Sequence, residues 1–152
     1  TISSYLDYTN ESYLTFGISC FTDSISDRET NKKHYFYDNG ILNLFLFQPE
    51  TKLLENMVAI HLYKKYGEDL YYYNKNVEVD FCVPKEGLLV QVSYRMLDDT
   101  TKNREVGALQ KGAKFLKAKK CMIITYDQEE TITLKDLEID VEVVPIYKYL
   151  LD

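Results

Sequence analysis

The chain has 152 residues, of which 45% are hydrophobic, and a formal net charge of −6. This length and apolar content predict one ordinary domain with a hydrophobic core. The longest apolar run, residues 41–47, is far shorter than the roughly 20 residues of a membrane-spanning helix, so we expect no membrane partner. The negative net charge argues against a protein that binds polyanions over its whole surface.

The start of the chain, TISSYLDYTN, carries neither an initiator Met nor the basic and apolar regions of a signal peptide. We therefore interpret the chain as a piece cut from a longer protein. Residues 1–30 are expected to be an extension that links to a missing upstream region, and residues 31–152 to form the domain itself.

Three cysteines, Cys20, Cys82 and Cys121, are widely separated, and each lies in a predicted strand. An odd number at such spacing is typical of neither a disulfide framework nor a zinc site. The pattern predicts reduced, buried thiols and a cytoplasmic location.

The first half of the chain predicts, in order, a short helix and an extended segment within residues 1–21, a polar loop at 22–33, a strand at 34–38, a short helix at 40–47 and a long helix at 51–67. Asp38 can cap the short helix, Pro49 ends it, and Gly67 is a natural stop for the long one. The long helix carries apolar residues at helical spacing: Leu54, Met57, Val58 and Leu62.

The second half predicts strands at 70–74, 77–83 and 87–95, a helix within the basic segment 102–120, strands at 121–126, 131–134 and 141–144, and a terminal helix at 145–151. A helix between two strands favours a parallel crossover, so we expect residues 121–126 to run parallel to residues 87–94. The predicted fold class is α/β, with a mixed central β-sheet flanked by helices.

Carboxylates on the second of these strands are the first candidates for chemistry. Because side chains alternate along a strand, one face should hold Glu78, Asp80 and Cys82, and the other Val77, Val79, Phe81 and Val83. If the next strand pairs with this one, Asp80 can lie near Gln91 and Ser93, and Glu55 of the long helix can point to the same place. Two carboxylates with a carbonyl and waters can hold Mg²⁺ or Mn²⁺. The alternative is that these carboxylates are ordinary solvent-facing side chains.

The order of these residues resembles that of the PD-(D/E)XK nuclease superfamily: a helix Glu, a strand Asp, then a polar-Val-polar segment on the next strand, followed by a helix. Segments such as YFYDNGILN, EVDFCV, LLVQVSY and VVPIYKYLL further resemble a C-terminal domain of unknown function on bacterial and archaeal AAA+-type P-loop ATPases. The resemblance covers residues 30–152 and, less clearly, residues 5–21. It implies a restriction-endonuclease-like core and an upstream ATPase domain as partner in the same chain.

The resemblance also implies which residues correspond to a nuclease site. Glu55 and Asp80 match the superfamily's metal ligands, whereas Gln91 and Ser93 stand where a Glu and a Lys are expected. A neutral amide is a weaker ligand than a carboxylate, and Ser carries no charge to offset the charge of a phosphoryl-transfer transition state. Glu55, Asp80, Gln91 and Ser93 therefore form a vestigial catalytic set. Lys111 and Lys114 are candidates for a migrated lysine, although their spacing predicts that they face outward.

The segment from residue 102 to residue 120 holds seven basic residues and one acidic residue. We expect Lys102, Arg104, Lys111 and Lys114 to contact DNA phosphates if DNA binds, and the alternative is a solvated helix face. Within this segment GALQKGAK superficially matches a Walker A loop. Ala113 separates its Gly112 from Lys114 and no hydroxyl follows, so ATP binding by that route is excluded.

Three functions remain open from the sequence. The first is a non-catalytic nuclease-like module that binds DNA or a partner protein, or regulates the ATPase. The second is an active Mg²⁺- or Mn²⁺-dependent nuclease with a rearranged site. The third is a homo-oligomerisation or docking domain, for which Tyr71, Tyr72 and Tyr73 would supply aromatic contacts.

Overall fold

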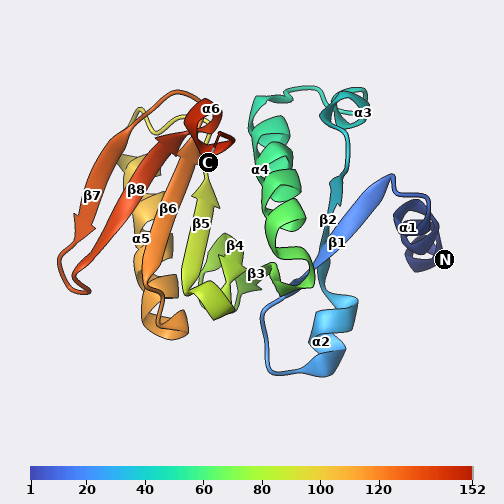
Figure 1. Cartoon of the computed structure of the whole chain (residues 1–152), viewed down its shortest axis with the longest axis horizontal. Helices are drawn as coiled ribbons and strands as arrows, with labels where there is room; N and C mark the ends of the chain where they lie inside the picture. Colours follow the sequence, from blue (N-terminus) through green and yellow to red (C-terminus); the bar gives the residue numbers. More distant parts are fainter. Residues whose placement is uncertain (152) are drawn as a thin grey trace.

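A computed structural model describes residues 1–151 and contains one eight-stranded sheet in the order β2-β1-β3-β4-β5-β6-β8-β7 (Figure 1). The strands are β1 (Thr15–Cys20), β2 (Lys32–Phe36), β3 (Tyr71–Asn74), β4 (Glu78–Val83), β5 (Leu88–Val92), β6 (Lys120–Thr125), β7 (Glu130–Leu134) and β8 (Ile139–Pro145). The helices are α1 (Ile2–Glu11), α2 (Ile25–Thr30), α3 (Asn39–Asn43), α4 (Glu50–Tyr66), α5 (Asp99–Leu116) and α6 (Ile146–Tyr149), with short 3-10 turns η1 (Gly67–Asp69) and η2 (Pro84–Glu86).

The sheet is mixed, with antiparallel and parallel pairs, and helices cover both of its faces, which confirms the predicted α/β class. β5 and β6 are parallel and are joined through α5, as the sequence predicted. One hydrophobic cluster joins the sheet to α4 and α6, and a second joins it to α5. Figure 1 shows the arrangement of these helices about the sheet. Residues Thr15–Cys20 pair with both β2 and β3, so part of the expected N-terminal extension lies within the sheet.

Helix α4 begins at Glu50 and ends where Gly67 adopts a φ of +54°, a conformation that costs glycine little. Leu54, Val58 and Leu62 are buried on its inner face, as their spacing predicted, but Met57 lies half-exposed. Buried Asn56 ties this helix to the edge strand β2. Its side chain accepts from Phe36 N–H (2.8 Å) and donates to Phe36 C=O (2.9 Å), and so satisfies backbone groups that a sheet edge leaves unpaired.

Helix α5 begins where the Asp98 side chain accepts from Thr101 N–H at 2.8 Å. It approaches the sheet closely at Gly112, where an added Cβ would lie 2.9 Å from Val79 Cγ2 and 3.2 Å from Leu89 Cδ1. This close approach brings the polar residues one to two turns earlier on α5 up to the side chains of β4 and β5.

Three local predictions are corrected by the structure. The expected loop at 22–33 contains helix α2, which Ser24 caps by accepting from Asp27 N–H. The short helix capped by Asp38 ends at Asn43 instead of residue 47. The terminal helix covers only Ile146–Tyr149, because Pro145 still belongs to β8.

Strand β4 departs from simple alternation next to Asp80. Val79 packs beneath α5 together with Cys82, whereas Phe81 and Val83 pack on the α4 side. The cause is a register shift between β3 and β4, where Tyr71 pairs with Cys82 but Tyr73 pairs with Val79. The prediction that Val79 shares a face with Phe81, and Cys82 one with Asp80, was therefore wrong.

The three cysteines are unpaired by disulfides and buried, as predicted. Among the helices of the described residues, none has both the length and the apolar character that a membrane crossing requires.

Candidate active-site cleft

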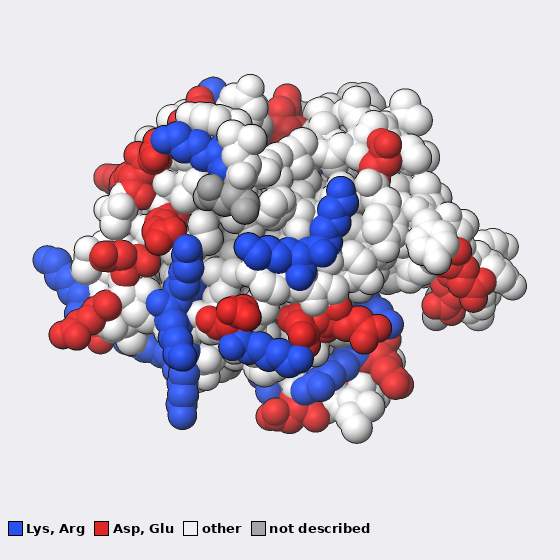
Figure 2. Space-filling view, in the orientation of Figure 1, with Lys and Arg blue, Asp and Glu red and all other residues white. Residues whose placement is uncertain are grey.

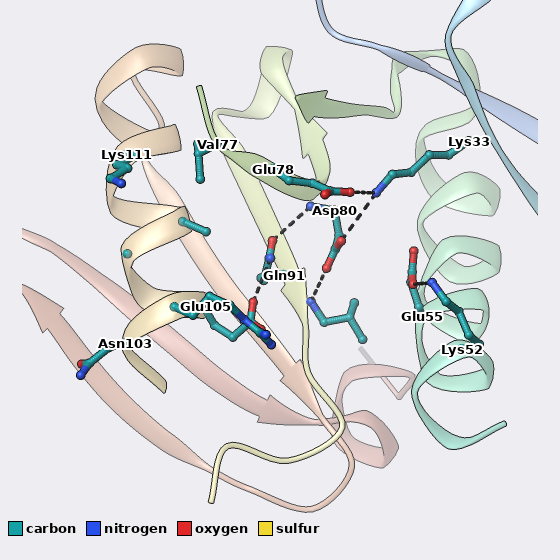
Figure 3. A pocket seen from close by; sticks show the side chains of 14 residues that line it. Lys33, Lys52, Glu55, Val77, Glu78, Asp80, Gln91, Asn103, Glu105 and Lys111 are labelled. Atoms are coloured by element: carbon teal, nitrogen blue, oxygen red, sulfur yellow. Dashed lines mark hydrogen bonds and ion pairs between the residues drawn. The ribbon is translucent and has the colours of Figure 1, made fainter. Parts of the chain in front are cut away.

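A cavity of about 590 Å³ opens between α4 and α5, over the ends of β4 and β5 (Figure 3). Its charged lining residues come from four elements: Lys33 from β2, Lys52 and Glu55 from α4, Glu78 and Asp80 from β4, and Arg104, Glu105 and Lys111 from α5, with Gln91 from β5 between them. The cleft therefore concentrates charges of both signs.

Asp80 lies where β4 and β5 stop pairing. The strand ladder ends with the pair of Phe81 and Val90, and beyond it side chains replace the backbone partners. Val92 N–H donates to Asp80 Oδ2 at 2.9 Å, and Asp80 N–H donates to Gln91 Oε1 at 3.1 Å. The predicted proximity of Asp80 to Gln91 is therefore confirmed. It results from two side-chain hydrogen bonds, in which Asp80 accepts from a backbone N–H of β5 and Gln91 accepts from a backbone N–H of β4.

The Asp80 carboxyl is held in an environment that disfavours its charged form. Burial, followed by the negative charge of Glu55, raises the pKa of Asp80 to about 7. The Val92 N–H and the Lys33 ammonium, 3.8 Å from Asp80 Oδ1, act in the opposite direction but do not cancel the effect. Asp80 is consequently half-ionised near neutral pH.

Lys33 reaches this carboxyl from the edge strand β2 (Figure 3). Its ammonium also lies over the ring of Tyr72, 5.1 Å from the ring centroid. Its ammonium also donates to Glu78 Oε1 at 2.6 Å. Burial alone would lower the pKa of Lys33, but the hydrogen bond to Glu78 and the charges of Asp80 and Glu78 outweigh it and raise the pKa. Lys33 is therefore a permanent cation beside Asp80, although it comes from β2 and not from the strand that carries Ser93.

Glu55 points from α4 toward the same cleft, as predicted, but both of its oxygens have partners. Tyr35 Oη donates to Oε1 at 3.0 Å, and Lys52 Nζ donates to Oε2 at 3.2 Å. Burial and the charge of Glu55 raise the pKa of Tyr35, so this hydroxyl stays a hydrogen-bond donor at all physiological pH values.

Gln91 joins Asp80 to a buried carboxylate on α5. Its Nε2 donates to Glu105 Oε2 at 2.9 Å, and Glu105 Oε1 accepts from Arg104 Nη2 at 2.6 Å. Glu105 is only 5% exposed. The amide of Gln91 thus accepts at one end and donates at the other, and both of its ends are used inside the protein (Figure 3).

Ser93 does not take part in the cleft. It is buried, its Oγ donates to Arg95 C=O at 3.4 Å, and it is absent from the cavity lining. Of the two residues expected beside Asp80, Gln91 contacts it directly and lines the cleft, whereas Ser93 is outside the cavity lining. Sequence reasoning missed Lys33 and Glu105. Glu105 had one detectable signal, because it precedes Leu109 by one helical turn on the buried face of α5.

The four basic residues expected to contact DNA separate into two pairs. Arg104 and Lys111 line the cleft, which corrects the prediction that Lys111 faces away from it. Lys102 instead pairs with Glu130 at 2.5 Å, and Lys114 lies 3.7 Å from Asp136, outside the cleft. No carboxylate of residues 1–151 pairs with Lys111.

The donor set does not make a ready metal site. Within the described chain, no three His, Cys, Asp or Glu side chains are grouped so that they could hold a metal ion. Mg²⁺ or Mn²⁺ would have to displace Lys52 and Tyr35 from Glu55 and compete with Lys33 for Asp80. The arrangement is better suited to hydrogen-bonding an anion at its basic rim.

The chain is similar to "Uncharacterized protein MJ1544" from Methanocaldococcus jannaschii, with 35% identity over 161 aligned residues. The alignment covers 99% of this chain and 36% of the relative, so the chain spans about a third of the length of that protein. No family model and no solved structure matches the chain.

Proposed function

We propose that this chain is a nuclease-like module with a degenerate active site that binds DNA through its cleft without cleaving it. The observation that carries the proposal is the placement of Gln91. A neutral amide occupies the position where the PD-(D/E)XK pattern requires a carboxylate. Its oxygen already accepts from Asp80 N–H and its nitrogen donates to Glu105, so the side chain is held by contacts within the protein.

Three further contacts support a binding role. Lys33 lies 3.8 Å from Asp80 and Lys52 lies 3.2 Å from Glu55, so the two remaining carboxylates of this set each have a lysine partner without a metal ion. Arg104 and Lys111 line the cleft. Arg104 donates to Glu105 through Nε and Nη2, but its side chain is 72% exposed, so its remaining nitrogen and the Lys111 ammonium can contact a phosphate. Figure 2 shows charges of both signs interspersed over the face it presents, which favours a local phosphate contact over a broad basic surface.

The proposal extends to the domain that would accompany this module in the intact protein. We propose that the module lies downstream of an AAA+-type ATPase domain in the intact protein, which its DNA or protein contacts would position or regulate, in a cytoplasmic setting suited to reduced thiols. A role in homo-oligomerisation through the three tyrosines has less support, because Tyr72 and Tyr73 are buried in the core.

Replacing the two rim cations should weaken DNA binding selectively. We expect the double variant Arg104→Ala, Lys111→Ala to lose about ten- to hundredfold in affinity at low salt and to reduce the slope of log K against log salt by about 1.8, because each lost phosphate contact removes about 0.9. The measurement is fluorescence anisotropy with labelled duplex and single-stranded DNA between about 50 and 200 mM salt.

The matched control is the double variant Lys102→Ala, Lys114→Ala, which removes the same charge from α5 but outside the cleft. It should stay within about twofold of wild type, since its phosphate contacts are not expected to change. Equal losses in the two double variants, or no DNA binding by wild type, would contradict the proposal. Thermal melting of each variant establishes that it is folded.

A second function, an active metal-dependent nuclease, is favoured by one observation. Lys33 supplies beside Asp80 the cation that Ser93 lacks, and Glu55 faces the same cleft. The measurement is plasmid nicking and cleavage of linear and single-stranded DNA with Mg²⁺ or Mn²⁺. We expect no cleavage, because Gln91 offers a metal no carboxylate. Cleavage that chelator and Asp80→Ala both abolish would replace the binding proposal with this one.

A further inference from the structure

A second cavity, of about 520 Å³, lies in a notch of the sheet beside β1 and shares no lining residue with the cleft. β1 pairs with β2 from Thr15 to Ser19, but with β3 only at Ser19 and Cys20. The residues before β3 form the turn η1 instead of extending the strand, so the first part of β1 has no neighbour on that side.

The backbone of Gly17 faces this notch. Tyr37 N–H donates to Leu14 C=O (3.1 Å) and Cys20 N–H donates to Asn31 C=O (3.2 Å), which places the polar groups of even-numbered residues of β1 toward β2. Phe21 N–H donates to Tyr72 C=O at 2.7 Å, so odd-numbered residues face the β3 side. Gly17 therefore presents a donor and an acceptor to the cavity with no strand opposite.

Aromatic side chains form much of the cavity wall. Phe16 stacks on Tyr63 with ring centroids 4.3 Å apart and lies 4.9 Å from the ring of Tyr37. Tyr13 stands at the rim and is 80% exposed. Phe16 is itself buried and supports these rings, whereas Tyr13 and Tyr37 are exposed. Exposed rings of this kind accept a planar ring by stacking, and this contribution is insensitive to the identity of a base.

Two cations lie at the same cavity. Arg28 uses Nε to donate to Thr22 C=O, which orients its guanidinium and leaves the two terminal nitrogens available. Lys32 extends over Gly17, with its Cδ near the position where a Cβ would stand. Throughout residues 1–151, no carboxylate forms an ion pair with either cation. A phosphate is the anion that such donors bind with the greatest charge complementarity.

We propose that this cavity is a nucleotide-binding site. The base lies against the tyrosine rings with its polar edge on Gly17 N–H and C=O, the phosphate binds Arg28 and Lys32, and Glu68 at the cavity wall accepts from a ribose hydroxyl. The volume of about 520 Å³ lies in the range of sites that hold small molecules. The site is independent of the cleft, because Lys32 and Lys33 are neighbours on β2 whose side chains line different cavities.

The test titrates AMP, GMP, CMP and UMP separately into the full chain and follows backbone amide shifts by NMR. We expect at least one of them to bind with a Kd of about 1 mM or lower and to shift the amides of Gly17 and Tyr63. Lys32→Ala should weaken that binding about tenfold, and Arg28→Ala should do so independently, since each removes a charge-assisted contact. Lys135→Ala is the matched control and should stay within about twofold of wild type, because this exposed lysine follows β7 at the opposite edge of the sheet from β2. Lys33→Ala reports on binding in the cleft instead.

Four outcomes would overturn the inference. The first is an absence of binding by all four nucleotides, and the second is binding that shifts Asp80 and Gln91 instead, because it would place the ligand in the cleft. The third is equal binding of inorganic phosphate, which would indicate an anion contact without base recognition. The fourth is loss of binding in Lys33→Ala but not in Lys32→Ala. The nucleotide test does not depend on the DNA-binding test, because the two cavities share no lining residue. A failure of DNA binding at the cleft would therefore leave the nucleotide-site inference standing.

Discussion

Asp80→Asn is expected to make the protein more stable than wild type above pH 7, by roughly 2–4 kcal/mol in the free energy of unfolding. Burial and Glu55 raise the pKa of Asp80 to about 7, whereas an unfolded Asp titrates near 3.9. Between these values the folded state binds more protons than the unfolded state, so this group's contribution to stability falls as pH rises. Asn resembles the protonated form and carries no such penalty.

The stability difference between the two proteins should depend on pH. Below about pH 4 the side chain is neutral in both states, and the two proteins should be equally stable. The advantage of Asp80→Asn should grow from there and level off above pH 7. Denaturant unfolding of both proteins between about pH 4 and pH 8 measures the difference. A difference that does not change with pH would contradict the prediction.

Glu55→Gln provides the control for the cause of the raised pKa. Among the neighbouring charges, Glu55 opposes ionisation of Asp80 most strongly, so its removal should lower the pKa of Asp80. In a Glu55→Gln background the gain from Asp80→Asn should therefore shrink.

In wild type, loss of the Asp80 charge as pH falls through 7 should also strengthen phosphate binding at the rim, because a negative charge leaves the cleft.

Gln91→Glu is expected to destabilise the fold by about 3–5 kcal/mol at neutral pH, although it restores the carboxylate of the nuclease pattern. Gln91 Nε2 donates to buried Glu105 at 2.9 Å. The substitution replaces that donor with a second carboxylate, so two negative charges would meet between two buried side chains. Denaturant unfolding measures the loss, which should become smaller at acidic pH, where one of the two carboxyls takes up a proton.

The matched variant exchanges the two side chains. Gln91→Glu combined with Glu105→Gln keeps one carboxylate and one amide in contact, and the carboxylate introduced at position 91 can still accept from Asp80 N–H. We expect this double variant to recover most of the lost stability, with a favourable coupling energy of about 2–3 kcal/mol. If the changes in unfolding free energy of Gln91→Glu and Glu105→Gln simply add up in the double variant, the contact between residues 91 and 105 does not contribute to stability. Nicking assays on the double variant show whether a carboxylate at position 91 is enough to restore metal-dependent cleavage.

The sequence alone determined the features that depend on local periodicity and on chain order. Strand-type and helix-type spacing predicted the α/β class, the parallel pairing of β5 with β6 and the burial of the three cysteines. It also placed Asp80 near Gln91, because two consecutive strands joined by a short turn have little choice of register. Each of these features depends only on a residue's own element and on the element next to it in the chain.

Only the tertiary structure decided which charges meet in the cleft. Lys33 reaches Asp80 because an edge strand lies across the sheet from β4, and no spacing in the sequence relates residues 33 and 80. Glu105 is buried because Gly112 lets α5 approach the sheet, and Val79 changes face because a register shift interrupts β4. The physical reason is the same in each case. A side chain's direction follows from its own element, but its partners depend on the register and distance of elements far away in the chain.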